Sequence, residues 1–388
     1  MNILFITNMF PPIRTGSSHY ALNHAAAFHE TGHTVTVLTV KIRGYDTALD
    51  KKYPFDVIRI PNLMIRLSGF DWFSITSLNI FNYFRVANII KKQKIEIVHQ
   101  VSHYLDTAII SRIVCPLLNV KYVVSIHSQL VFKSKLFKPF LKLADRLICG
   151  RFILPKSEKI ISLDSEIERY TRERYRSKKL NEKIISIPHG INIKEKRASQ
   201  VHDFKLRHKI VSLGHIIALR DRTNLIRAMK IIVAEYPNIQ LEIIGQVYKE
   251  DSVRLVKDLN LENNVVFSGE LSHEESQKRL LSSDIHAVWI TSDYVGLGRS
   301  VSESMLLCVP VVNNSPENLL GANELKNMEN IVLVDGDDIQ DIAEKLLMLL
   351  KNEVLRKKIG LGGQKFICDH LNLEKTKDRL LALYKSVH

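Results

Sequence analysis

The chain has 388 residues, more than one hydrophobic core normally holds, so its length predicts about two domains. Apolar residues make up 45% of it and charged residues 25%, as in an ordinary globular protein. No apolar run approaches the roughly 20 residues of a membrane-spanning helix. With 55 Lys and Arg against 41 Asp and Glu, the net charge of +14 favours nucleic acid, anionic lipid or phosphate-rich ligands as partners.

The start of the chain and its cysteines both predict a cytoplasmic protein. The sequence opens on an apolar strand, without the basic segment and cleavage site of a secretory signal. Its cysteines lie far apart and form no Cys-x-x-Cys pair, which argues against a disulfide framework and against a zinc site. We therefore expect four reduced cysteines, Cys115, Cys149, Cys308 and Cys368.

Short apolar strands alternate with amphipathic helices along the chain, which predicts doubly wound parallel α/β sheets. The first series of strands is predicted at 3–7, 35–40, 57–60, 96–99, 122–126, 159–162 and 184–187. The second series is predicted at 209–213, 240–244, 265–267, 286–290, 309–312 and 331–334. Helices are predicted between them, for example at 17–31, 223–235, 273–283 and 341–350. The polar, basic segment 194–209 is the expected interdomain linker, and a last helix at 375–386 could pack on either domain.

The loop after the first strand, residues 8–18, precedes a helix and contains Gly16. Ligands of open α/β sheets bind beyond the carboxyl ends of the strands, and a helix N-terminus attracts anions. Gly16 would let the backbone approach a phosphate closely. The alternative is an ordinary turn glycine followed by a serine cap.

A second loop, 295–300, carries two glycines and a serine at the start of a helix and just after a predicted strand. Its free backbone N–H groups suit a diphosphate. Glu303, one turn into the helix, could accept hydrogen bonds from ribose hydroxyls. The alternative is a glutamate that only compensates the helix dipole.

Further loops follow other strands of the second series. His215 and Arg220 come after the first of them, and a guanidinium such as that of Arg220 matches phosphate oxygens. Gly245 and the segment 267–271 follow two more strands. Several glycine-marked loops at one sheet edge favour a ligand site over a purely structural explanation.

Seven segments together resemble the retaining glycosyltransferases of family four. The chain opens like the family, with a strand, Phe10-Pro11-Pro12 and a glycine loop before a helix that ends in Gly32-His33-Thr34-Val35. The other five segments similar to family motifs are Ser125-Ile126-His127, Ile187-Pro188-His189-Gly190-Ile191-Asn192, Phe267-Ser268-Gly269, Ser283-Asp284-Ile285 and Glu303 to Val312. The resemblance implies the GT-B architecture, two Rossmann-like domains that face each other across a cleft, and a reaction that needs no bound metal or cofactor.

The resemblance also implies a role for each domain and for individual residues. Residues 1–195 would bind the acceptor, 206–370 the nucleotide-sugar, and the helix 371–388 could cross back to the first domain. His127 would be the catalytic residue near the reacting sugar. The diphosphate would lie against Gly16, His215, Arg220, Gly298, Arg299 and Ser300. The ribose and base would lie against Glu303, Gly245 and Leu271, and the donor sugar against Asp293, Val295, Gly296 and Leu297.

The chain departs from the family pattern at three positions. Val295 stands where the family has a second glutamate that contacts the donor sugar, and valine cannot hydrogen-bond a hydroxyl. His215 and Arg220 replace the family's Arg and Lys on the diphosphate, and histidine is only partly charged near neutral pH. Cys308 replaces a glycine. Phosphate binding is therefore expected to persist, while sugar recognition differs.

A basic helix is predicted within 133–156, which has seven basic residues and one acidic residue. Lys135, Lys138, Lys142 and Arg146 would share one face and apolar residues such as Phe140 and Leu147 the other. Such a helix could lie on an anionic membrane. The alternative is a surface helix whose apolar side packs on the sheet.

These features predict a retaining glycosyltransferase that uses a nucleotide-sugar and a lipid-linked or polysaccharide acceptor at the inner membrane face. By resemblance, bacterial envelope or capsule synthesis is the expected setting. One alternative is a catalytically impaired relative that binds a nucleotide or a partner. Another is a nucleotide-sugar epimerase or phosphorylase of the same fold. Nucleic acid is a less favoured partner, because no recognised motif supports it.

Overall fold

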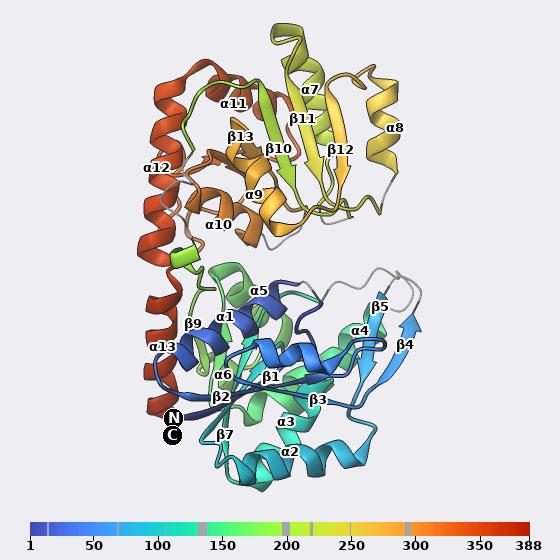
Figure 1. The fold of residues 1–388 in the computed structure, drawn as a ribbon, viewed down its shortest axis with the longest axis vertical. Coiled ribbons are helices and arrows are strands. Elements are labelled where there is room, and N and C mark those ends of the chain that lie inside the picture. Colours follow the sequence, from blue (N-terminus) through green and yellow to red (C-terminus); the bar gives the residue numbers. More distant parts are fainter. Residues whose placement is uncertain are drawn as a thin grey trace. The chain divides into compact units, whose positions relative to one another are not determined.

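The computed structural model describes residues 1–13, 15–67, 70–104, 106–130, 138–195, 202–217, 220–248, 250–291 and 296–388. Backbone contacts divide the chain into two compact units (Figure 1). Unit 1 comprises Met1–Gly190 and Leu373–His388, and unit 2 comprises Ile191–Asn372. The assignment of acceptor binding to 1–195 and of donor binding to 206–370 stays a prediction.

Unit 1 is built on a seven-stranded parallel sheet in the order β3-β2-β1-β6-β7-β8-β9. Its strands are β1 (Asn2–Ile6), β2 (Thr34–Val40), β3 (Asp56–Ile60), β6 (Ile97–Val101), β7 (Lys121–Ile126), β8 (Ile160–Ser162) and β9 (Ile184–Ser186). The order reverses between β1 and β6, and ligands of such sheets bind beyond the strand ends at this point. A separate antiparallel hairpin, β4 (Leu63–Leu67) and β5 (Phe70–Ile75), follows β3.

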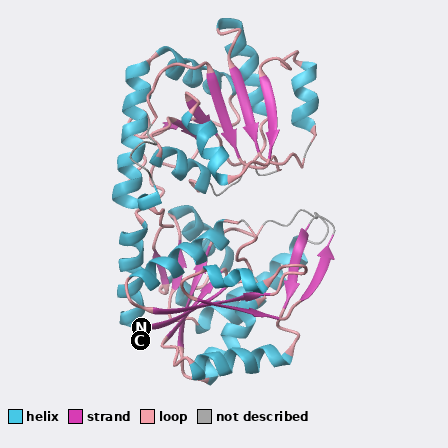
Figure 2. Ribbon diagram, viewed as in Figure 1, coloured by secondary structure: helices cyan, strands magenta, loops and turns pink. Residues whose placement is uncertain are grey.

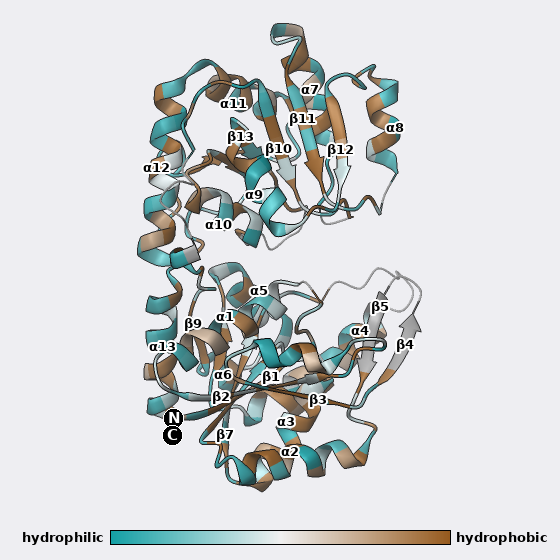
Figure 3. Ribbon diagram, viewed as in Figure 1, coloured by the Kyte–Doolittle hydropathy of each residue, from teal (hydrophilic) through white to brown (hydrophobic). Residues whose placement is uncertain are grey.

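Helices cover both faces of this sheet (Figure 2). They are α1 (Gly16–Glu30), α2 (Ile80–Lys92), α3 (Thr107–Leu117), α4 (Lys138–Asp145), the π-helical η2 (Arg146–Ile153), α5 (Ser165–Tyr175), α6 (Lys178–Asn181) and α13 (Leu373–Val387). Short 3-10 turns are η1 (Thr47–Lys52) and η3 (Leu154–Lys156). Side chains alternate along β1, so Ile3 and Phe5 pack with α1 and α13, whereas Leu4 and Ile6 pack with α2 and α3. The strands read as continuous apolar runs because both faces are buried (Figure 3).

Unit 2 repeats the plan with a six-stranded parallel sheet in the order β12-β11-β10-β13-β14-β15. Its strands are β10 (Lys209–Leu213), β11 (Gln240–Ile244), β12 (Val265–Gly269), β13 (Ile285–Ala287), β14 (Val311–Asn313) and β15 (Val332–Leu333). Its helices are η4 (Ile193–Glu195), α7 (Thr223–Glu235), α8 (Asp251–Asp258), α9 (His273–Leu281), α10 (Arg299–Leu306), α11 (Ile339–Lys351) and α12 (Glu353–His370). The order reverses between β10 and β13, which places the second ligand-binding edge there.

The predicted fold class is confirmed, since both sheets are parallel and doubly wound. The hairpin β4–β5 was not predicted. The strand expected at 286–290 is β13, which ends at Ala287. The Val288 N–H still bonds the Val312 carbonyl at 3.0 Å, but the Ile290 N–H donates to the side chain of Asn314, at Oδ1, at 3.1 Å. The last helix packs on α1 in unit 1, where both termini lie (Figure 1).

The expected linker, 194–209, is only partly described, because 196–201 lie outside the described residues. The described part from 202 onward lies against unit 2. His202 is buried and its Nε2 bonds the Ser283 carbonyl oxygen at 2.5 Å, while Phe204 is buried beside it. The chain passes from one unit to the other at two places, and a β-bridge between Ile191 and Asn372 joins these two segments.

In the parts of the chain that the structure describes, none of the helices combines the length and the apolar character needed to cross a bilayer.

Candidate functional site

The loops with predicted donor contacts gather at the carboxyl edge of the unit 2 sheet. The loop after β10 carries His215, the loop after β11 carries Gly245, and Leu271 follows β12. The segment after β13 leads into α10 at Gly298. Because all these strands are parallel, their carboxyl ends share one edge, and β10 and β13 are neighbours there.

The N-terminus of α10 is open to a ligand. Gly298 has φ +78° and precedes the helix without a side-chain cap, and a Cβ built on it meets nothing within 4 Å. The Arg299 and Ser300 N–H groups have no intrahelical acceptor, since the first helical bond runs from Ser302 N–H to the Gly298 carbonyl. The helix is attached to strand β13, because Ser304 Oγ bonds His286 Nδ1 at 2.8 Å. Free N–H groups at the positive end of a rigid helix can bind an anion.

Glu303 lies one turn into α10 and is mostly buried, with a side chain 14% exposed. Arg299 Nε donates to its Oε1 at 2.6 Å. His273, at the start of α9, lies 4.0 Å from its Oε2, which brings the loop after β12 next to Glu303. The second oxygen therefore remains available for the predicted ribose hydroxyls.

Gly245 has a packing reason to be glycine. Its φ is +140°, and a Cβ there would lie 2.6 Å from the Gly214 carbonyl and 2.7 Å from the His215 nitrogen. The backbones of the two loops thus touch at this point. His215 is tied to the same loop, because the Gln246 N–H donates to its Nδ1 at 3.0 Å. A role of Gly245 with the donor base stays a prediction.

Arg220 lies at the same edge, and Arg222, which the sequence analysis did not single out, lies beside it. A Cβ on Gly214 would meet Arg220 Nη1 at 3.4 Å and Arg222 Nη2 at 3.6 Å. Burial lowers the pKa of both guanidinium groups, that of Arg222 to about 9, and Arg220 adds to the shift of Arg222. The signal in the sequence was Arg220-Asp221-Arg222, two arginines directly after a strand loop.

The predicted contacts with the donor sugar are only partly described. Asp293 and Val295 lie outside the described residues. Gly296 is described, and Leu297 is 6% exposed with its side chain in the core beneath α10. Only the backbone of Leu297 is therefore left for the predicted contact.

In unit 1, His127 follows β7 at the carboxyl edge and is half-buried. Its Nε2 bonds Ser125 Oγ at 2.8 Å, and Ser125 Oγ bonds His99 Nε2 at 2.9 Å. Tyr20 from α1 packs against the His127 ring edge to face, with centroids 4.4 Å apart. Burial is the main cause that holds the pKa of His127 well below its usual range, and the nearby His99 lowers it further. His127 is therefore neutral at pH 7. It can donate or accept a hydrogen bond, but it does not act as a cation.

Gly16 begins α1, and Thr15 caps the helix by accepting from the Ser18 N–H. A Cβ built on Gly16 meets nothing within 4 Å. Packing alone thus gives no reason for glycine here, which leaves room for the predicted approach of a ligand.

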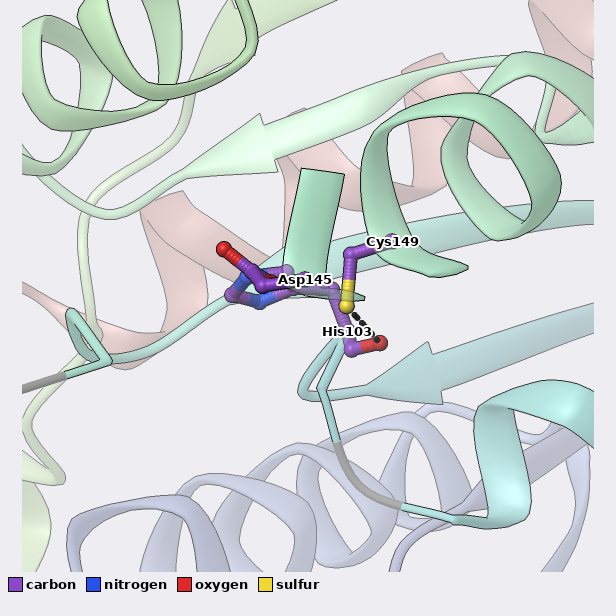
Figure 4. Close-up of side chains that lie close together, drawn as sticks. All are labelled: His103, Asp145 and Cys149. Atoms are coloured by element: carbon purple, nitrogen blue, oxygen red, sulfur yellow. Dashed lines mark hydrogen bonds between the residues drawn. The ribbon is translucent and has the colours of Figure 1, made fainter. Parts of the chain in front are cut away.

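A buried cluster behind the same edge joins His103 after β6, Asp145 at the end of α4 and Cys149 of η2 (Figure 4). Asp145 Oδ2 accepts from Arg174 Nε at 2.6 Å, and Tyr175 OH donates to Oδ1. A guanidinium thus already neutralises the carboxylate, so we assign no metal to this cluster.

The basic helix is α4 with η2. Lys142 and Arg146 are exposed as predicted, while Lys135 and the side chain of Lys138 lie outside the described residues. The idea that the apolar side packs on the sheet is wrong for most of it, since Phe140 is 68% exposed, Leu147 45% and Ile148 47%. The reason is the helix register, which turns Asp145 and Cys149 inward instead.

Solved structures show the same architecture. HepE of Anabaena in complex with UDP matches with a TM-score of 0.78 over 100% of both chains, at 15% sequence identity. Two doubly wound domains with glycine-marked loops at their carboxyl edges, in this arrangement of strands, define the chain as a protein of the GT-B fold.

The family follows from the sequence models. Residues 14–195 match the model described as Glycosyltransferase Family 4, and residues 194–366 match Glycosyl transferases group 1. Together they span 14–366, and the chain belongs to the family-4 glycosyltransferases.

Curated relatives are distant. A Corynebacterium glutamicum enzyme named GDP-mannose-dependent monoacylated alpha-(1-6)-phosphatidylinositol monomannoside mannosyltransferase is 25% identical over 57% of this chain and 61% of its own length. A Staphylococcus aureus poly(ribitol-phosphate) alpha-N-acetylglucosaminyltransferase is 29% identical over 45% of this chain and 35% of its own length. The chain thus matches less than two thirds of the length of these relatives.

Proposed function

We propose that this chain transfers a sugar from a nucleoside-diphosphate sugar to a lipid-linked or polysaccharide acceptor with retention of the anomeric configuration. Relatives named for lipid, teichoic acid, capsule and lipopolysaccharide glycan synthesis support the acceptor class. Envelope or capsule synthesis at the inner face of the plasma membrane is the setting we propose.

The observation that carries the donor site is the start of α10. An uncapped helix N-terminus lies just beyond β13, at the point where the strand order reverses, and Glu303 lies one turn further with one oxygen available. This arrangement offers N–H groups to a diphosphate and a carboxylate to a ribose.

The proposed chemistry needs positive charge where the diphosphate leaves. As the bond from the anomeric carbon to the phosphate oxygen breaks, negative charge develops on the diphosphate. The N–H groups of Arg299 and Ser300 and the guanidinium of Arg220 would stabilise it. His127, neutral and held by Ser125, would hydrogen-bond the transferred sugar.

The surface of α4 and η2 supports membrane contact. Phe140, Leu147 and Ile148 are exposed beside the cations Lys142 and Arg146. Exposed apolar side chains next to cations are typical of helices that lie in the interface of an anionic bilayer.

A catalytically impaired relative is the second candidate, and one observation favours it. His215, which replaces a family arginine, accepts the Gln246 N–H at Nδ1, so this nitrogen does not donate to a phosphate. In that case the chain would bind a nucleoside diphosphate but turn over no sugar.

Thermal stability against UDP, GDP, ADP and their sugars tests the donor site. Saturation at about 100 times the dissociation constant stabilises the protein by about 2.7 kcal/mol. We expect one diphosphate and its sugar to raise Tm, and Glu303→Ala to abolish the rise. Glu275→Ala removes a comparable Arg–Glu pair on α9 and should leave the rise intact. No rise with any nucleotide would refute the donor site.

Turnover separates the two candidates. The bound nucleotide-sugar is incubated with membrane lipid extract, and release of the nucleoside diphosphate is measured. Release that depends on the extract supports the transferase. Binding without release, with extract or polysaccharide acceptors, supports the impaired relative.

A further inference from the structure

Arg222 is a fully buried guanidinium without a counter-group. It precedes α7 and its side chain is 0% exposed. None of Nε, Nη1 and Nη2 has a hydrogen-bond partner among the described residues. A buried cation left in this state costs several kcal/mol, because it has lost its water and gained nothing in return.

The chain treats its other buried arginines differently. Arg59 pairs with Asp50 at 2.6 Å, and Arg174 pairs with Asp145 at 2.6 Å. Arg356, as deeply buried as Arg222, donates to the carbonyl oxygens of Phe204, Leu349 and Leu350. Burial of a guanidinium is thus normally compensated within this fold, and Arg222 is the exception in the described chain.

The surroundings of Arg222 add positive charge and no ion pair. Its Nη2 would lie 3.6 Å from a Cβ on Gly214, next to Nη1 of Arg220. The nearby carboxylate of Asp221 instead accepts from the Thr223 N–H, and no ion pair joins it to Arg222 among the described residues. Two guanidinium groups therefore lie side by side against one glycine at the end of β10.

The nearby His286 cannot take the place of a cation, and His215 is occupied at one ring nitrogen. His286 accepts the Leu213 N–H at Nε2 and bonds Ser304 at Nδ1, so its ring is neutral. Burial, and then the charge of Arg222, lower the pKa of His286 to about 3. His215 uses its Nδ1 to accept the Gln246 N–H.

The location of Arg222 relates it to the predicted donor site. Gly214 directly follows β10, and His286 lies on the neighbouring strand β13 and contacts α10 through Ser304. Arg222 therefore lies between the loop after β10 and the strand beneath the open helix N-terminus.

We infer that Arg222 binds the diphosphate of the donor together with Arg220, beside the loop in which His215 replaces the family's arginine. This inference rests on the proposed function, since it names a residue of the same site. A guanidinium presents its donors in a fork that fits two phosphate oxygens. An anion would provide the missing counter-charge, so the ligand-free protein would be destabilised locally and the bound protein would not.

The test compares Arg222→Met with the matched control Arg356→Met in the full-length protein. Without ligand, Arg222→Met should raise Tm by about 3 °C, because it removes an uncompensated buried charge. Arg356→Met should lower Tm, because it leaves three buried carbonyl groups without their donor. A structural arginine at 222 would instead behave as the control does.

Binding of UDP, GDP, ADP and inorganic pyrophosphate is then measured by calorimetry. Arg222→Met should lower the affinity for the diphosphate that the wild type binds by about 100-fold. The affinity for the corresponding monophosphate should fall less. Arg222→Lys keeps the charge but not the fork, so its affinity should lie between the two. This variant retains the test if Arg222→Met does not fold.

The outcomes separate the two ideas. Unchanged diphosphate affinity in Arg222→Met and Arg222→Lys, with normal binding by the wild type, overturns the role of Arg222 alone. A wild type that binds neither the nucleoside diphosphates nor pyrophosphate overturns the donor site and the role of Arg222 with it.

Discussion

Tyr384 on α13 and His99 on β6 share a buried hydrogen bond of 2.5 Å, although 285 residues separate them in the sequence. The bond is the first of a chain that continues through Ser125 to His127. If Tyr384 O–H donates to Nδ1 of His99, then His99 Nε2–H donates to Ser125, and Ser125 O–H donates to His127 Nε2. Nδ1 of His127 then carries the proton. In the opposite direction, the Tyr384 proton would have no acceptor among the described residues.

Tyr384→Phe should therefore lower turnover by about tenfold or more, because the tautomer of His127 is no longer fixed. Nitrogen NMR of labelled histidine should show the proton of His127 moving from Nδ1 to a mixture of both nitrogens. Tyr122→Phe is the control, since it also loses one buried hydrogen bond, to the Ile153 carbonyl. If the Tyr384→Phe enzyme keeps normal turnover and the same His127 tautomer, the chain of hydrogen bonds from Tyr384 does not fix that tautomer.

Acid should destabilise the protein between pH 6.5 and 4. Burial lowers the pKa of His24 and His103 to about 4 and of His99 and His286 to about 3. The unfolded chain, with histidine pKa values near 6.5, binds more protons in this range, so stability falls as pH falls. Each fully buried histidine lowers the free energy of unfolding by up to about 2 kcal/mol when the pH falls to 5.

One group acts in the opposite direction. Burial raises the pKa of Asp164 to about 6, so that its contribution to stability grows as pH falls. One carboxyl does not offset four histidines, and we expect Tm to drop between pH 7.5 and pH 5. Calorimetric scans across this range check the sign, and a constant or rising Tm would show that the histidines are not buried as described.

Gly16→Ala should separate ligand approach from folding. The site has ordinary helical geometry and open space, so alanine should leave Tm unchanged within about 1 °C. If a phosphate or acceptor approaches the backbone there, turnover should fall about tenfold or more. Gly245→Ala is the contrasting variant, because its methyl group would collide with backbone atoms and should lower Tm by several degrees. Full turnover in Gly16→Ala would remove Gly16 from the site.

Phe140→Ser with Ile148→Ser should weaken binding to vesicles of phosphatidylglycerol and phosphatidylcholine by about tenfold. These two exposed side chains would lose their insertion into the interface. Val354→Ser, which removes an even more exposed apolar side chain from α12 in unit 2, should bind vesicles as the wild type does. Equal binding by all three proteins in co-sedimentation would argue against α4 and η2 as the membrane surface.

The alternation of apolar strands with amphipathic helices was enough to predict the fold. Strands such as β10 and β11 begin and end at the predicted residues, because each is a short, mainly apolar segment that is buried between helices. The hairpin β4–β5 was not predicted although Leu63–Leu67 is mainly apolar, because an antiparallel pair does not fit the alternation of strand and helix. The motif at Glu303 could be read because a helix start, a glycine loop and a carboxylate lie close together in the sequence.

Hydrogen bonds between distant segments could not be predicted in this way. Arg222 resembles any surface arginine until folding removes its water and leaves it without a partner. Tyr384 and His99 lie on elements whose contact depends on where the last helix packs. Local sequence therefore determined the strands, helices and loop motifs, since these depend on periodicity and turn chemistry. The tertiary structure decided which polar groups are buried and paired, because burial depends on elements far apart in the chain.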